Sequence, residues 1–219
     1  MVRVLELFSG TQSVGKICKE KGWESISLDN CDYKKKFIPT HLKDILEWDY
    51  KIYPVGHFDY IWCSPPCQMY SVLQNCWLGN EKVINGVKTL WTKELWEENM
   101  TKSDDLVKKC FEIIDYFKPK YWFLENPYTG LLKKREIMKD KKSYIVDYCM
   151  YCDWGYRKRT IIWSNKNLTL KKCNNKCGNG IKTGNRYKHN ACVAKDIGGG
   201  KTRHMRYRIP PKLICDILG

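Results

Sequence analysis

The chain has 219 residues, of which 43% are hydrophobic and 29% charged, which indicates one folded domain with at most a small appendage and excludes a largely disordered chain. Its apolar runs fall far short of the ~18 residues of a membrane helix, and its start carries no secretory signal, so we expect an intracellular, non-secreted protein without a transmembrane segment. Thirty-nine basic against 24 acidic side chains give a net charge of +15, which favours a nucleic acid partner, although an AT-rich coding genome would also enrich lysine.

The chain contains twelve cysteines, which need a structural or chemical explanation. A small secreted chain would use them as a disulfide framework, but this chain has no signal peptide and is long enough to bury its own core. We therefore interpret them as thiols, metal ligands or a nucleophile.

Strand and helix patterns alternate over the first three quarters of the chain. Apolar runs at residues 2–8, 24–28, 58–63, 121–124, 144–146 and 160–163 predict strands. Helices are expected at 14–21 and from a Ser103 cap to Phe117, where Pro119 follows. This alternation predicts an α/β fold, a doubly wound and mainly parallel sheet covered on both faces.

Two regions interrupt the alternation. Residues 73–101 hold three tryptophans among charges and are expected to form a long, partly helical excursion. Residues 166–201 are rich in Lys, Asn and Gly, and the pattern favours a loop or a small irregular module held by a metal.

Ligands of doubly wound sheets bind at the carboxyl ends of the strands, and unusual residues follow several predicted strands here. Residues 8–15 form a glycine turn that offers backbone amides, Asp29 ends the second strand, and Asp44-Ile45 pairs a polar with an apolar side chain suited to an adenine edge. Each acid, taken alone, equally fits a solvated loop residue.

The sharper signal is a pair of segments after two buried strands. Cys63-Ser64-Pro65-Pro66-Cys67-Gln68 places a cysteine on a turn made rigid by two prolines, and Leu124-Glu125-Asn126-Pro127 offers a carboxylic acid. A thiolate and an acid together suit covalent attack on a protonatable ring. A buried cysteine and a capping glutamate are the alternative for either segment alone.

These segments together resemble the cytosine carbon-5 DNA methyltransferases, and in particular compact phage or large-virus members. Phe8-Ser9-Gly10 with Glu6 is similar to the first cofactor motif, Pro66-Cys67-Gln68 to the catalytic motif, and Glu125-Asn126 to the Glu-Asn-Val motif. Arg157-Lys158-Arg159 resembles the Arg-x-Arg motif, and residues 208–213 resemble the Val-Pro turn before the closing helix. The resemblance covers about residues 2–165 and the last dozen or so.

The sequence departs from the family in four places. Gln12 replaces a second glycine, Pro127 replaces a valine, and Tyr207-Arg208 stands where Gly-Asn is usual. Only residues 166–201 occupy the place of a much larger target-recognition domain. We expect a Rossmann-like catalytic domain of residues 1–165 plus 202–219 and a small recognition insert of residues 166–201.

The resemblance implies transfer of a methyl group from S-adenosylmethionine to carbon 5 of cytosine, in a short sequence context of double-stranded DNA, by a monomeric enzyme. It implies that Cys67 attacks carbon 6, that Glu125 donates to ring nitrogen 3, and that Arg157 and Arg159 hold the pyrimidine or a phosphate and favour the thiolate. Residues 73–101 become a candidate loop that closes over the flipped base. The implied cofactor residues are Phe8, Gly10, Thr11, Ser13, Val14, Asp29, Asp44, Ile45 and Pro65.

Substrate contacts are expected beside the cysteine and in the insert. The expected substrate-binding residues are Gln68, Ser71, Asn126, Arg186, Tyr187, Lys188 and Asn190. Within the insert, Cys173, Cys177, His189 and Cys192 match the ligand types of a tetrahedral structural zinc, although the spacing is not that of a standard finger. An unliganded lysine-rich loop is the alternative. Cys149 and Cys152 form a closer pair, but strand alternation would point them apart.

Three other functions stay open at this stage. One branch of the same family methylates tRNA with the same catalytic residues, so RNA is a possible substrate. Ser64-Pro65-Pro66 also resembles the Ser-Pro-Pro-Tyr of amino-methyltransferases, but Cys67 stands where those enzymes have an aromatic residue. A nucleic-acid-binding protein with a decayed site is the third, and Gln12 keeps it open.

Overall fold

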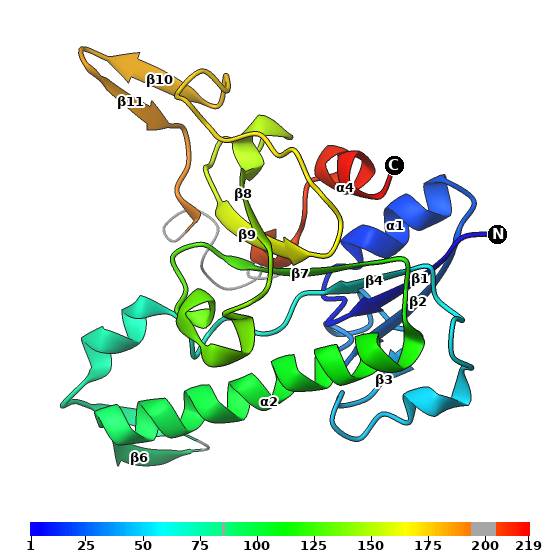
Figure 1. The fold of residues 1–219 in the computed structure, drawn as a ribbon. Coiled ribbons are helices and arrows are strands. Elements are labelled where there is room, and N and C mark those ends of the chain that lie inside the picture. The colour runs from blue at the N-terminus through cyan, green and yellow to red at the C-terminus, as the bar shows by residue number, and fades with distance from the viewer. Residues whose placement is uncertain (85, 194–204) are drawn as a thin grey trace.

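A seven-stranded sheet forms the centre of the molecule in the computed structural model, which describes residues 1–84, 86–193 and 205–219 (Figure 1). Across the sheet the order is β3 (His41–Leu42), β2 (Glu24–Asp29), β1 (Arg3–Leu7), β4 (Tyr60–Cys63), β7 (Tyr121–Pro127), β9 (Arg159–Ser164) and β8 (Ser143–Asp147). The first five strands in this order are parallel to their neighbours, whereas β9 runs antiparallel to both β7 and β8. The mainly parallel α/β sheet predicted from the sequence is confirmed.

Helices cover both faces of this sheet (Figure 1). α2 (Lys93–Phe117) packs Val107, Cys110 and Ile113 into the core on one face, and α1 (Ser13–Glu20) and α4 (Pro211–Leu218) fill the other. Alternation along β4 sends Ile61 to the first core and Trp62 to the second. Burial on both faces explains why the central strands read as continuous apolar runs.

The long helix α2 begins earlier than the sequence predicts. Thr92 is its N-cap, and the Thr92 side chain accepts a hydrogen bond from the Leu95 amide at 3.2 Å. The predicted cap, Ser103, is wrong, because this residue lies inside the helix and donates its hydroxyl to the Asn99 carbonyl. Charged residues dominate the first turns, so the apolar spacing that marks the helix is clear only after Ser103.

The excursion at residues 73–101 is partly helical, as predicted. It contains a 3₁₀ helix (Val72–Trp77), a hairpin of β5 (Glu81–Ile84) and β6 (Val87–Leu90), and the first turns of α2. Trp91 and Trp96 are buried against the core, which anchors this segment beside α2. Further 3₁₀ turns among the described residues include Tyr50–Ile52, Leu132–Lys134, Glu136–Met138 and Tyr148–Met150.

A second hairpin stands away from the sheet (Figure 1). It pairs β10 (Gly180–Thr183) with β11 (Arg186–His189) and lies inside the predicted insert of residues 166–201. Residues 194–204, which include the predicted boundary between insert and catalytic domain, lie outside the described residues, so this division stays a prediction. Within the part of the chain that the structure describes, no helix has the length and apolar character needed to cross a membrane.

Candidate active site

A cavity of about 350 Å³ opens where β1, β2, β4 and β7 end. We call it the sheet cavity. Its position follows from topology, because the carboxyl ends of parallel strands meet at one edge and leave a crevice there. The structure places nine of the predicted site residues on its wall: Phe8, Gly10, Ser13, Asp29, Pro65, Cys67, Gln68, Glu125 and Asn126.

Cys67 follows β4 on a turn that is fixed from both sides. The Asn126 side chain on β7 donates to the Pro65 carbonyl at 3.0 Å, and the Trp62 indole donates to the Ser64 hydroxyl at 3.1 Å. Pro65 is buried while Cys67 is half-buried, so the thiol reaches the cavity from a rigid turn. A residue placed in this way needs little reorganisation before it reacts.

Glu125 lies near the carboxyl end of strand β7 and is buried. Its carboxylate accepts a hydrogen bond from the Tyr148 hydroxyl at 2.9 Å, and the Lys158 ammonium lies 3.5 Å from the same oxygen. Burial raises the pKa of the Tyr148 hydroxyl far above its usual value, so this group remains a proton donor. The carboxyl group is therefore held in one orientation at the cavity wall.

Lys158 is a cavity residue that the sequence analysis missed. It lies between two arginines on an extended segment, so its side chain points opposite to theirs and into the cavity. Burial raises the pKa of the Cys67 thiol, whereas the positive charges of Lys158 and Arg206 lower it and Glu125 raises it. The alternation of side chains in Arg157-Lys158-Arg159 was the signal that could have identified Lys158.

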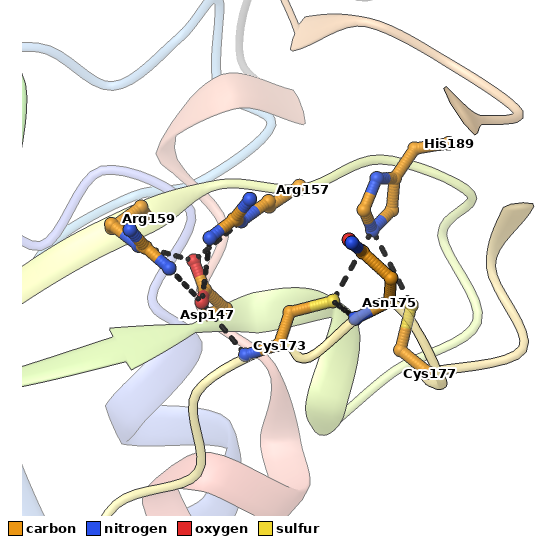
Figure 2. Close-up of polar contacts among 7 residues, drawn as sticks. All are labelled: Asp147, Arg157, Arg159, Cys173, Asn175, Cys177 and His189. Atoms are coloured by element: carbon orange, nitrogen blue, oxygen red, sulfur yellow. Dashed lines mark hydrogen bonds and ion pairs between the residues drawn. The ribbon is translucent and has the colours of Figure 1, made fainter. Parts of the chain in front are cut away.

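Arg157 and Arg159 turn the other way, toward Asp147 (Figure 2). Arg157 donates to the Asp147 carboxylate at 3.0 and 3.3 Å, and Arg159 donates at 2.9 Å through both its Nε and Nη2 atoms. Asp147 is fully buried, so two guanidinium groups neutralise one carboxylate. Neither arginine is on the cavity wall, and their predicted contacts with the pyrimidine or a phosphate stay a prediction.

The turn after β1 shows how Gln12 takes the place of a glycine. Glu6 accepts hydrogen bonds from the Val14 and Gly15 amides at 3.1 and 2.9 Å, and burial raises its pKa to about 7. Gln12 has φ +53°, a left-handed conformation that costs about 1–2 kcal/mol for a residue with a side chain. Its amide donates to the Ile38 carbonyl at 2.5 Å, and its side chain does not line the sheet cavity.

The acid at the end of β2 is bound by the backbone. Asp29 accepts hydrogen bonds from the Gly10 amide at 2.8 Å and the Cys31 amide at 2.9 Å, while burial raises its pKa. Asp44 and Ile45 do not line the sheet cavity but a smaller cavity of about 60 Å³ beside it, which Asp29 and Phe8 also line.

Three further predicted residues, Thr11, Val14 and Ser71, also lie off the wall. Thr11 bonds the Ser13 hydroxyl, Val14 is buried against α4, and Ser71 caps the 3₁₀ helix that follows it. The wall also contains residues that the sequence analysis did not propose as site residues, although several of them stand in or beside its motifs. These residues are Glu6, Ser9, Asn30, Tyr33, Ser64, Pro66, Pro127, Lys158, Val193, Arg206, Tyr207 and Ile209, of which the last three come from the segment before α4.

The predicted substrate residues of the insert lie on the hairpin of β10 and β11 or just after it. Arg186 and Lys188 are exposed on one face. Tyr187 points to the opposite face, where its hydroxyl lies 3.5 Å from the Cys177 sulfur, and the Asn190 amide donates to the Asn179 carbonyl. We call residues 148–156 and 171–193 the cysteine lobe.

The structure groups the predicted metal ligands only in part. Cys149, Cys173, Cys177 and His189 lie together, with the four candidate ligand atoms within 4.8 Å of one another, and Cys192 is not part of this group, so its role as a ligand stays a prediction. β8 ends at Asp147, and a 3₁₀ turn then points Cys149 to the group while Cys152 donates to the Tyr148 carbonyl. Cys149 and Cys152 therefore diverge, as predicted, and Cys149 joins the group of candidate ligands.

Solved structures define the class of the fold. The methyltransferase EhMeth of Entamoeba histolytica superimposes with a TM-score of 0.50 at 16% identity, covering 78% of this chain and 56% of that one. Dnmt2 methyltransferase of S. pombe gives a TM-score of 0.43 at 12% identity, covering 78% and 51%. The superposition on EhMeth shows that the fold of this chain is that of a Rossmann-like methyltransferase. The chain spans about half the length of these two proteins.

A curated relative identifies the family within this class of methyltransferase folds. A Frog virus 3 (isolate Goorha) protein named "Probable DNA (cytosine-5)-methyltransferase" is 38% identical over 228 residues, covering 99% of both chains. No family model matches the chain. At this identity and coverage, the chain belongs to the DNA (cytosine-5)-methyltransferase family, which confirms the resemblance found in its motifs.

Proposed function

We propose that this protein methylates carbon 5 of cytosine in DNA, with S-adenosylmethionine as methyl donor and Cys67 as covalent nucleophile. One observation carries the proposal: the thiol of Cys67, the carboxyl of Glu125 and the ammonium of Lys158 share one cavity with the glycine turn after β1. The name of the Frog virus 3 relative supports DNA as the substrate.

The residues around the turn fit the cofactor by their chemistry. A cavity of about 350 Å³ lies in the ~300–1,000 Å³ range of small-molecule sites. The Asp29 carboxylate would accept hydroxyl hydrogen bonds, the Phe8 ring and Ile45 would contact the adenine, and the backbone near Gly10 would hold the amino acid end. S-adenosylmethionine would supply an electrophilic methyl group on a sulfonium centre.

The protein's own groups would activate the base. Cytosine is too weak a nucleophile at carbon 5, so the Cys67 sulfur forms a bond to carbon 6 while Glu125 donates a proton to nitrogen 3. The ring becomes an enamine that is nucleophilic at carbon 5. After methylation, carbon 5 releases its proton to water, and the sulfur–carbon 6 bond breaks to return the thiolate of Cys67. Nitrogen 3 returns its proton to Glu125, which restores the aromatic ring.

Tyr148 and Lys158 act as positioning residues in this scheme. Both contact Oε1 of Glu125, and neither is needed as a nucleophile. The Lys158 charge also favours the thiolate of Cys67, which is the reactive form of cysteine.

DNA would approach from the exposed side of the cavity. The net charge of +15 suits a phosphate backbone, and the exposed Arg186 and Lys188 suit base edges in a groove. A hairpin of this size presents few such contacts, so we expect a short target of about two or three base pairs, in which each good contact discriminates by ~1–3 kcal/mol. Residues 73–101 remain the candidate loop over the extruded base.

The decisive experiment traps the covalent adduct. Incubation with cofactor and DNA that contains 5-fluorocytosine should yield a stable protein–DNA adduct for the wild type and none for Cys67→Ser, because fluorine blocks loss of the carbon 5 substituent. Cys215→Ser, which changes a half-buried cysteine of α4 outside the cavity, is the matched control and should trap DNA normally.

Product analysis separates the alternatives. Methylated carbon 5 in DNA supports the proposal, whereas methylation of RNA alone, of an exocyclic nitrogen, or of nothing contradicts it. An adduct that persists in Cys67→Ser would exclude this cysteine as the nucleophile.

A further inference from the structure

We propose that Cys149, Cys173, Cys177 and His189 bind one Zn²⁺ ion that fixes the hairpin of β10 and β11 on the catalytic sheet. The four side chains come from three separate segments: the turn after β8, the loop before β10 and the end of β11. Figure 2 shows His189 above the two loop cysteines, with Asp147 and its arginines beside them.

The spacing of the ligand atoms matches a tetrahedral site. Zn–S bonds of about 2.3 Å and Zn–N bonds of about 2.0–2.1 Å separate ligand atoms by about 3.6–3.8 Å. In the structure, Nε2 of His189 lies 3.7 Å from the Cys173 sulfur and 3.3 Å from the Cys177 sulfur. All four candidate ligand atoms lie within 4.8 Å of one another, so a single ion can reach them with small side-chain adjustments.

The donor set selects the metal. Three thiolates and one imidazole form a closed set that suits structural zinc, whereas magnesium and calcium prefer oxygen ligands. The Asn175 amide donates to the Cys173 sulfur at 3.4 Å, and the Tyr187 hydroxyl lies 3.5 Å from the Cys177 sulfur. Donors that contact a ligating sulfur in this way orient the thiolate and reduce its charge.

Electrostatic balance also favours the ion. Three thiolates around one Zn²⁺ leave one surplus negative charge, and two arginines against Asp147 leave one surplus positive charge. The two charged groups are neighbours, because the Cys173 amide donates to the Asp147 carboxylate at 2.8 Å. The metal site and the arginine pair would thus neutralise each other at the edge of the sheet.

Residues 171–193 of the cysteine lobe have little else to fold around. Among residues 171–193, Asn179 alone is buried, and its side chain donates to the Cys149 and Cys152 carbonyls at 2.9 and 2.8 Å. The aliphatic Ile181 is 68% exposed. A small module without an apolar core usually needs a metal or disulfides, and a structural zinc contributes its binding free energy to folding.

Metal analysis of ligand variants tests the site. Purified wild-type protein, dialysed against buffer with a small excess of ZnCl₂ and then against metal-free buffer, should retain one zinc per chain by mass spectrometry. Cys173→Ser and Cys177→Ser should lose it. Replacement by Co²⁺ should give the absorption of a tetrahedral thiolate site, which disappears in the same variants.

Two further cysteines are matched controls. Cys152→Ser, whose thiol points to the Tyr148 carbonyl, and Cys192→Ser should both keep one zinc per chain. Cys149→Ser should lose it, and its circular dichroism shows whether the sheet still folds. Zinc lost from Cys192→Ser and kept in Cys149→Ser would overturn the ligand set. A wild type that retains no zinc, or that holds a disulfide among these cysteines instead, would overturn the metal site.

Protease susceptibility tests what the ion holds. A strong chelator should expose residues 171–193 to trypsin, with cleavage at least tenfold faster, while the protein retains the circular dichroism of the sheet. Equal cleavage with and without chelator would show that the ion does not fix the hairpin. None of these measurements depends on methyl transfer, so this proposal and the proposed function can fail separately.

Discussion

The sheet cavity and the cysteine lobe hold their polar side chains by opposite means. Around the cavity, the strand residues Leu7, Cys63 and Leu124 are completely buried, so the backbone that presents Cys67 and Glu125 is fixed by the apolar core. In residues 171–193 of the lobe, hydrogen bonds, ion pairs and sulfur contacts take over this role. Changes in polar groups should therefore leave the cavity folded and loosen the lobe.

The boundary between the two regions runs through three consecutive residues. Arg157 and Arg159 bind Asp147 on the side of the lobe, and Lys158 lines the cavity. The motif thus serves both regions at once, because alternate side chains of an extended segment point to opposite sides.

The largest effect that separates the regions is expected for Glu125→Gln. The amide can still accept from Tyr148 but cannot deliver a full proton to the base, so single-turnover methyl transfer should fall ~10²–10⁴-fold while the lobe stays intact. Glu136→Gln, an exposed residue, is the control and should leave the rate unchanged. A decrease below threefold would remove Glu125 from the chemical step.

Asp147→Asn should have the opposite pattern, with the lobe loosened more than the chemistry. Asp147 is fully buried and accepts from two arginines and the Cys173 amide, so its neutralisation should lower the free energy of unfolding by about 2–4 kcal/mol. This value lies below that for a fully buried pair, because the arginine side chains are 34% and 35% exposed and can turn to water.

Urea denaturation measures this loss, and Asp153→Asn is its control on the exposed surface of the same lobe. A change below about 0.5 kcal/mol, the usual range for surface substitutions, would mean that the carboxylate does not connect the lobe to the sheet.

The contrast between the two regions also explains what could be predicted from the sequence. Cys67 closely follows the buried strand β4, and Glu125 lies near the end of the buried strand β7, so local pattern and sheet topology were enough to bring them to one cavity edge. The grouping of Cys149 with His189 depends instead on where β8 ends and on how the hairpin folds back, which no local pattern records.

The start of α2 and the cavity position of Lys158 were not predicted correctly from the sequence. The start of α2 was placed at Ser103 because charged residues conceal the apolar face of its first turns. Lys158 was not predicted as a site residue, because the resemblance to the Arg-x-Arg motif concerns only the two arginines. Side-chain alternation in an extended segment nevertheless predicts that Lys158 points the other way. In both places the deciding feature is local: the Thr92 cap marks the start of α2, and alternation alone directs Lys158 to the cavity.

The smallest effect is expected for Lys158→Gln at the boundary itself. Burial raises the pKa of Cys67, and Lys158 lowers it, so removal of the ammonium raises this pKa further. Less thiolate is then present at neutral pH, and the acid limb of the pH–rate profile moves to higher pH. We expect the rate at pH 7 to fall about fivefold, the equivalent of the ~1 kcal/mol typical of a charge pair at a partly hydrated site.

Lys158→Arg keeps the positive charge and should keep the profile. The measurement is single-turnover methyl transfer between pH 6 and 9, with adduct formation on 5-fluorocytosine DNA as a second readout. A profile that does not move in Lys158→Gln would show that the cavity sets the reactivity of Cys67 without this lysine, and that the boundary motif belongs to the lobe alone.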